Sequence, residues 1–309
     1  NDGLSGSTVA NSYGIYAGAN AVALTTSGTG DNYDNITVNN CEFTRAYFGL
    51  YIGGTTTNTA DNLNINNNIF GSAITSEKLS FRGIEINNVN TSTIAQNEIF
   101  ELKVTTSINP AGVSTLGTCN TNVISRNKIY GIWSTSTTGW GAYGIQFAAG
   151  ANNTIVNNVI YDVYTTNYSA TSTTWNAFGI RLTAGTNYKI YYNSINMFGA
   201  YTYTGNTTCA SAALVLTSTA ITGEVKNNIF NNSMTSTAAT QKHMAVWFPT
   251  GYNFLNCTMN NNAYMVSNST NHFVGKIGTT TGTGEYVTLS NWAAISQVNN
   301  PTNDNASVP

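Results

Sequence analysis

Three aspartates near the N-terminus form the densest group of carboxylates in the sequence: Asp31, Asp34 and Asp61. Glycosidases use two or three carboxylates that converge on one face, and polysaccharide lyases need a carboxylate cluster for Ca²⁺ beside an Arg or Lys base. Asp34 and Asp61 fall at the same position of two successive repeats. The equivalent positions in later repeats carry Thr91, Thr121 and Asn152. A row of turn-forming polar residues is therefore the competing interpretation.

Two further sets of charged residues recur with the same period. Glu98 and Lys128 are expected in neighbouring repeats as an opposite-charge pair, which is a modest surface contact. A second column is expected to point outward and holds Glu85, Ser114, Gln146 and Arg181. Glu85 and Arg181 are three repeats apart, which is too far for direct cooperation. Neither set predicts a catalytic centre.

Large aromatic residues gather in three long insertions in the middle of the chain. Such rings pack against the C–H faces of sugars, while neighbouring Thr and Asn satisfy hydroxyl groups. The sequence therefore predicts a glycan-binding platform made of Trp133, Trp140, Tyr143, Tyr164, Tyr168, Trp175, Tyr201 and Tyr203. The alternative is that these rings fold back and cover the strands beneath them.

Histidine and cysteine offer little chemistry. His243 and His272 have no Cys or acidic partner at a useful spacing, so no metal site, catalytic triad or cofactor is predicted. The four cysteines are far apart in the sequence, and both disulfides and buried free thiols stay open. Calcium enters only under the lyase alternative.

The elements that position these residues follow from a repeated phrase. Each unit has a short apolar segment that begins with Gly, or with Ala in the last two units, then a polar turn and a second apolar segment centred on Asn. The recurring Asn residues are Asn40, Asn67, Asn97, Asn127, Asn158, Asn193, Asn228 and Asn261. A period of about 30 residues, with two short strands and no helical pattern, is typical of a solenoid.

We therefore expect an all-β, right-handed parallel β-helix of about eight coils over residues 1–265, with longer loops on one corner. The Asn residues are predicted to stack as a structural ladder in which each amide bonds to its neighbours along the axis. Gly is expected to serve tight corners. Residues 266–309 are predicted to be an irregular capping or junction segment.

The composition fits this fold. The chain of 309 residues has 47 Asn and 48 Thr but only 24 charged side chains, which favours strands and turns. A net charge of −2 with no basic stripe excludes nucleic acid as an expected partner. No apolar run reaches the length of a membrane span and no signal peptide opens the chain, so we expect a piece of a longer protein.

Two segments resemble known repeats. Residues 123–130 (VISRNKIY) and 155–161 (IVNNVIY) look like the repeats of right-handed β-helix proteins related to pectate lyases. Residues 261–264, 273–275 and 286–292 resemble a segment of very large exported surface proteins of the Bacteroidetes. The resemblance implies a fold shared by lyases, glycosidases, tailspikes and non-enzymatic surface proteins.

Taken together, the sequence predicts an extracellular or cell-surface rod with an adhesive, glycan-binding face. Its expected partners are glycans or other surface polymers and further copies or modules of the parent protein, end to end. A polysaccharide lyase or hydrolase that uses Asp31, Asp34 and Asp61 is the first alternative. A purely structural spacer is the second.

Overall fold

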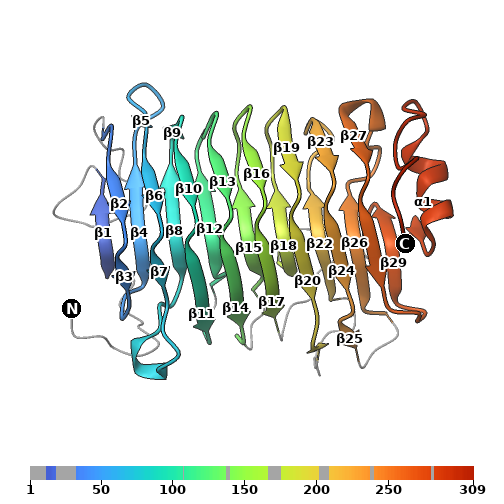
Figure 1. Cartoon of the computed structure of the whole chain (residues 1–309). Helices are drawn as coiled ribbons and strands as arrows, with labels where there is room; N and C mark the ends of the chain where they lie inside the picture. The colour runs from blue at the N-terminus through green and yellow to red at the C-terminus, as the bar shows by residue number, and fades with distance from the viewer. Residues whose placement is uncertain are drawn as a thin grey trace.

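The protein is a rod of stacked parallel strands. The computed structural model describes residues 12–18, 33–106, 108–136, 140–165, 175–201, 209–236, 240–279 and 282–309, except for the side chains of Tyr201 and Ser236. Figure 1 shows the strands side by side from β1 to β29, with the helix α1 at the C-terminal end. The predicted parallel β-helix is thereby confirmed as a β-solenoid of about seven turns.

Three parallel sheets form the walls of the rod. Sheet 1 contains, in spatial order, β1 (Tyr13–Ala17), β4 (Phe48–Gly53), β8 (Arg82–Asn87), β12 (Ala111–Leu116), β15 (Ala142–Phe147), β18 (Ala177–Leu182), β22 (Ala210–Leu216), β26 (Lys242–Phe248), β29 (His272–Ile277) and β30 (Glu285–Tyr286). Only the last pair, β29 and β30, is antiparallel among the described strand pairs.

Sheets 2 and 3 are narrower walls of eight strands each. Sheet 2 contains β2 (Thr37–Asn39), β6 (Asn64–Asn66), β10 (Thr93–Ala95), β13 (Val123–Ser125), β16 (Thr154–Val156), β19 (Tyr188–Tyr191), β23 (Gly223–Lys226) and β27 (Cys257–Asn260). Sheet 3 contains β3 (Glu42–Phe43), β7 (Ile69–Phe70), β11 (Glu98–Val104), β14 (Lys128–Ser134), β17 (Val159–Thr165), β20 (Ser194–Met197), β24 (Ile229–Asn232) and β28 (Ala263–Val266).

Several short elements lie outside the three sheets. They are the strand pairs β5 (Ala60–Asp61) with β9 (Val89–Asn90) and β21 (Ala200–Tyr201) with β25 (Thr235–Ser236), the 3₁₀ turns η1 (Thr75–Glu77) and η2 (Phe254–Asn256), and the helix α1 (Leu289–Ser296). The few helical residues agree with a composition rich in Asn and Thr.

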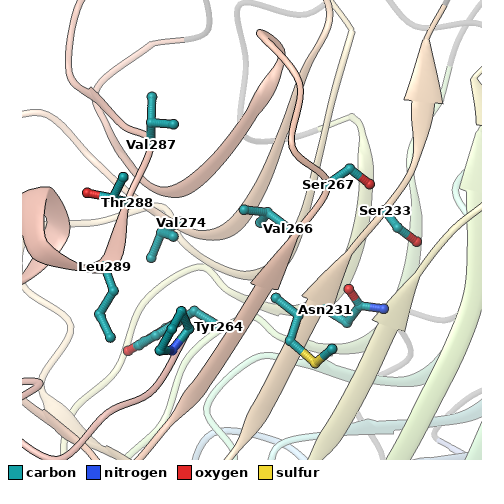
Figure 2. Close-up of a pocket in the computed structure, with 11 residues that line it drawn as sticks. Asn231, Ser233, Tyr264, Val266, Ser267, Val274, Val287, Thr288 and Leu289 are labelled. Carbon is teal, nitrogen blue, oxygen red and sulfur yellow. The ribbon is translucent and has the colours of Figure 1, made fainter.

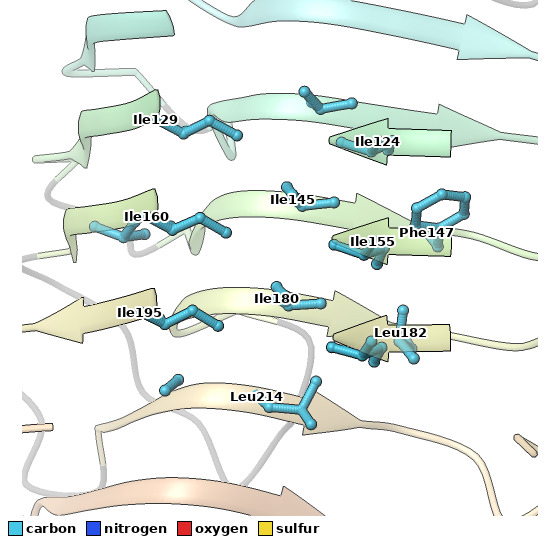
Figure 3. Close-up of a cluster of buried hydrophobic side chains, with 14 of the residues drawn as sticks. Ile124, Ile129, Ile145, Phe147, Ile155, Ile160, Ile180, Leu182, Ile195 and Leu214 are labelled. Atoms are coloured by element: carbon cyan, nitrogen blue, oxygen red, sulfur yellow. The ribbon is translucent and has the colours of Figure 1, made fainter. Parts of the chain in front are cut away.

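The core consists of columns of identical or similar apolar residues. Ile124 and Ile155 lie in register on sheet 2, and Ile129 and Ile160 lie in register on sheet 3, all fully buried. Figure 3 shows these side chains stacked from rung to rung, with Ile145 of sheet 1 facing them. Because each rung buries its apolar residues against the next, the core runs along the whole rod.

A buried asparagine ladder runs along the turn between sheets 2 and 3. In each rung the backbone N–H and the side-chain Nδ2 both donate to Oδ1 of the next Asn at 3.0 Å. Nδ2 also donates to a backbone carbonyl of the preceding rung at 2.8–2.9 Å. The ladder comprises Asn68, Asn97, Asn127, Asn158, Asn193, Asn228 and Asn262. These bonds satisfy polar groups that burial would otherwise leave unpaired.

Three residues assigned to the ladder from the sequence are wrong by one position. Asn40, Asn67 and Asn261 precede the ladder and have positive φ angles of 56°, 53° and 57°. Asn tolerates this left-handed conformation better than most residues. Asn is therefore favoured at the left-handed position as well as at the ladder position that follows it. In the first rung Cys41 takes the ladder position, and its N–H donates to Asn68 Oδ1 at 2.9 Å.

The recurring glycines serve close packing within sheet 1, not tight corners as expected. Gly144 lies inside β15, where an added Cβ would come within 2.4 Å of Ile160 Cγ2 and 2.5 Å of the Gly179 oxygen. No side chain fits between these strands and the isoleucines of sheet 3 at that position.

The C-terminal segment covers the end of the solenoid. Trp292 of α1 is fully buried, and its ring packs 5.6 Å from Phe248 and 5.5 Å from Phe254. Asn303 Oδ1 accepts from the Met259 N–H at 2.8 Å, and Val308 bridges to Ala263 beside the last strand of sheet 3. We call residues 285–309 the cap.

The cap lies within residues 266–309, the part of the sequence expected to form a capping or junction segment. It pairs with strands of all three sheets at the C-terminal end of the rod. Strand β29 also belongs to sheet 1, so the solenoid continues past residue 265.

Candidate functional site

One aspartate of the N-terminal rungs, Asp34, accepts a hydrogen bond from the backbone of the next rung. Asp34 Oδ1 accepts from the Asp61 N–H at 2.8 Å. Further along the same corner, Asn90 Oδ1 accepts from Asn120 at 2.9 Å and Asn120 Oδ1 from Ala151 at 2.8 Å. Asp34, Asn90 and Asn120 therefore belong to one row of side chains that cap backbone N–H groups.

The residues predicted to be equivalent to Asp34 and Asp61 in later repeats were also wrong by one position. Thr91, Thr121 and Asn152 follow the capping row and have positive φ angles. Asp31 lies outside the described residues. Within the described ranges, no group of three His, Cys, Asp or Glu is arranged to hold a metal ion.

The column of Glu85 and Arg181 is buried, although it points away from the core. Glu85 is 1% exposed and forms an ion pair of 2.8 Å with Arg82. Burial raises the pKa of Glu85, and Arg82 opposes that shift. Ser114 lies next to Glu85 in the adjacent strand and is fully buried. A polymer in solvent does not reach these side chains.

The aromatic residues predicted as a platform separate into pairs. The ring of Trp133 lies 5.5 Å from that of Tyr164, and the ring of Trp140 lies 5.1 Å from that of Trp175. Lys103 covers Trp133, with Nζ 3.9 Å from the ring centre.

Other members of the predicted platform do not join these pairs. Tyr143 is fully buried and stacks on Phe178 at 6.0 Å, so its assignment as a binding residue is wrong. Tyr143 lies inside β15, and every side chain of this strand is buried, on the outer face of sheet 1 as well as on the face toward the core. Tyr168, Tyr203 and the side chain of Tyr201 lie outside the described part.

A different aromatic column lies on the outer face of sheet 3. Phe100, Tyr130 and Tyr161 are in register on β11, β14 and β17. Their ring centres are 5.2 and 4.8 Å apart, and their planes differ by 11° and 3°. We call these three residues the aromatic stack. All three rings are partly exposed. Neighbouring rings cover one another's facing sides, so a ligand that runs along the stack meets ring edges.

The sequence carried a signal for this stack that the prediction overlooked. Each ring stands three residues after a ladder Asn, as in Asn127 and Tyr130. The period of the Asn ladder therefore also places aromatic residues in one column of three successive rungs.

The column continues beyond the aromatic stack with amides. Asn196 pairs in register with Tyr161, and Asn231 pairs with Asn196. Asn231 Nδ2 donates to Asn196 Oδ1 at 2.6 Å. A cavity of about 290 Å³ lies over these residues, with Tyr161 at one end and Met265 at the other.

A second cavity of about 460 Å³ follows, where sheet 3 meets the cap. Figure 2 shows Val287, Thr288 and Leu289 of the cap on one side and Asn231, Ser233 and Ser267 on the other, with Val266 and Val274 between them. The two cavities share Asn231 and Met265. We call them together the sheet 3 groove.

No charged side chain lines the groove. None of the residues lining the two cavities is Asp, Glu, Lys, Arg or His. Apolar side chains stand exposed along it, including Val159, Ile229, Met265 and Val287. Exposed apolar residues that gather in one concave surface, interspersed with amides and hydroxyls, are typical of ligand sites.

A pair of opposite charges lies beside the aromatic stack. Lys128 Nζ lies 2.8 Å from Glu98 Oε1, and Tyr130 OH donates to the same oxygen at 3.0 Å. The hydrogen bond from Lys128 lowers the pKa of Glu98. Burial and the bond to Glu98 raise the pKa of Tyr130 to about 12, so its hydroxyl stays protonated.

None of the helices among the described residues is long and apolar enough to cross a membrane. Comparison with protein-family models, with curated proteins and with solved structures found no match to this chain.

Proposed function

We propose that this chain is an extracellular β-solenoid rod that binds glycan chains along the sheet 3 groove. The observation that carries the proposal is the single column of ligand-type side chains, three aromatic rings followed by two amides, on one exposed face. Sugar rings pack their C–H faces on aromatic rings, and amides exchange hydrogen bonds with hydroxyl groups.

The repeat of the rod suits a polymer. Successive rungs of a parallel sheet are spaced by about 4.8 Å. A sugar unit in an extended chain has a comparable length, so successive units meet equivalent positions on successive rungs. A glycan lying parallel to the axis contacts the aromatic stack first and then Asn196 and Asn231.

The remaining alternatives have less support. Of the aspartates proposed for cleavage, Asp34 accepts a hydrogen bond from the backbone N–H of Asp61, and Asp31 lies outside the described residues. A purely structural role leaves unexplained why apolar side chains such as Ile229 and Met265 stand exposed beside a cavity. The extracellular location rests on the low content of charged residues, 8% of the chain, and on the resemblance to exported repeats.

The test is binding to a panel of neutral and acidic polysaccharides, followed by calorimetry with oligosaccharides of the polymer that is retained. Loss of one aromatic contact in Tyr161→Ala is expected to weaken binding about tenfold. Tyr191→Ala is the matched control, because this half-buried tyrosine lies on sheet 2, away from the groove. Absence of binding to every polymer, or equal binding by Tyr161→Ala, would contradict the proposal.

A further inference from the structure

The cavity between sheet 3 and the cap differs in character from the rest of the groove. It is the larger of the two, at about 460 Å³, which falls within the range of small-molecule sites. It contains no open aromatic face, since Tyr264 is 1% exposed. We call this cavity the cap pocket.

One wall of the cap pocket is apolar. Val266 and Val274 come from the solenoid, and Val287 and Leu289 come from the cap. Val287 is 54% exposed, which is unusual for a valine at the mouth of a concave site. A sugar hydroxyl placed against this wall would lose its hydrogen bonds to water without replacement, at a cost in affinity.

The opposite rim is polar and neutral. It consists of the Asn231 amide and the hydroxyls of Ser233 and Ser267. Ser233 and Ser267 are partly exposed, so their hydroxyls are accessible to a ligand. Amide and hydroxyl groups together donate to a carbonyl and accept from an N–H.

We propose that the cap pocket binds an uncharged sugar unit that carries an acetamido group. The acetamido methyl packs on Val266 and Val287, while its N–H and C=O meet the amide and hydroxyls of the rim. Absence of ionised side chains among the lining residues disfavours sugar acids and amino sugars with a free ammonium group. This inference rests on the proposed glycan binding and specifies one subsite of it.

The test compares two oligosaccharide series of equal length and linkage that differ only in the substituent. Oligomers of β-1,4-linked N-acetylglucosamine and of β-1,4-linked glucose meet that condition. Calorimetry with the full chain is expected to show about tenfold tighter binding of the acetylated series.

The substitution Val287→Thr tests whether the preference for the acetylated series arises in the cap pocket. It replaces one methyl group by a hydroxyl at nearly constant volume and at an exposed position, and it is expected to remove most of the preference. Val298→Thr is the matched control, because Val298 is 52% exposed and lies outside the pocket. Thermal unfolding of both variants checks that the cap stays folded.

The outcomes separate this inference from the proposed function. Equal affinity for the two series, with binding still weakened by Tyr161→Ala, would overturn the acetamido site and leave glycan binding intact. A preference that survives Val287→Thr would also overturn it. If neither series nor any polysaccharide binds, the proposed function itself fails.

Discussion

At the scale of single residues, the corner between sheets 2 and 3 makes two different demands on adjacent positions. The first position needs a left-handed backbone, as at Asn67 with φ of 53°. The second needs an amide that bonds to two neighbouring rungs, as at Asn68. Asn suits both, for unrelated physical reasons.

The same substitution at these two neighbours is expected to have very different effects. Asn68→Gly removes a buried amide and leaves several polar groups unpaired, so the free energy of unfolding should fall by about 3 kcal/mol. Asn67→Gly keeps the left-handed backbone and should change stability by less than about 0.5 kcal/mol. Urea unfolding of both variants measures the difference, and equal losses would contradict the ladder assignment.

This corner also shows why the ladder residue of each rung could not always be predicted from the sequence. Asn97 stands alone, so its ladder role was predictable from spacing. Asn67 and Asn68, like Asn261 and Asn262, are adjacent and differ only in backbone conformation. In the first rung the ladder residue is Cys41, which the Asn pattern hides.

At the scale of elements, a buried histidine pair lies on two neighbouring strands of sheet 1 and is linked by hydrogen bonds to the end of β24 in sheet 3. The rings of His243 on β26 and His272 on β29 are 5.2 Å apart. Asn232 Nδ2 donates to Ser211 Oγ at 2.9 Å, and Ser211 Oγ shares a hydrogen bond of 2.8 Å with His243 Nδ1. Burial lowers the pKa of both histidines and so favours their neutral forms, and His272 Nε2 donates to the Met234 carbonyl at 2.7 Å.

The histidine pair predicts a loss of stability in mild acid. Burial, aided by His272, lowers the pKa of His243 to about 3, while the unfolded chain keeps the ordinary value of 6.5. Below pH 6.5 the His243 imidazole is protonated in the unfolded state but not in the folded state, so the free energy of unfolding declines as the pH falls toward 3. At about pH 5 the loss from this residue is about 2 kcal/mol.

The measurement is urea unfolding of the wild type and His243→Gln at about pH 7 and about pH 5. Acidic groups such as Glu98 titrate alike in both proteins, so the difference isolates the histidine. The variant should lose about 2 kcal/mol less than the wild type over this interval. A parallel decline in the two proteins would contradict the prediction.

The elements also explain which parts of the site were predictable. The aromatic stack lies at a fixed distance from the ladder Asn, so its column was present in the repeat. The prediction preferred the tryptophans of the insertions because large rings in loops suggest exposure. Burial of Tyr143 depends on what covers the outer face of sheet 1, and the period of a strand does not reveal that.

At the scale of the whole molecule, the rod depends on its cap. Trp292 inserts against Phe248 and Phe254, and Gly275 leaves room for the ring: an added Cβ would lie 1.9 Å from it. The solenoid fold itself was predictable, since each repeat contains the same strand and corner signals. A capping or junction segment was expected over residues 266–309, but its contacts with the sheets were not predictable, because this segment occurs only once in the sequence.

Removing the central ring of the cap is expected to uncover the last rungs. Trp292→Ala should lower the free energy of unfolding by about 3–5 kcal/mol. The uncovered edges of β27 and β28 should then promote association between rods, which light scattering detects. Val298→Ala, at an exposed position of the same segment, serves as the control and should leave both properties unchanged.

The central claim is that one glycan chain lies along the outer face of sheet 3. Its most direct test is the affinity for oligosaccharides of increasing length, measured by calorimetry with the best-bound polymer series. The column from Phe100 to Met265 crosses six rungs, so affinity should rise up to about six sugar units and then level off. Affinity that is already maximal for a disaccharide, or no binding at any length, would contradict it.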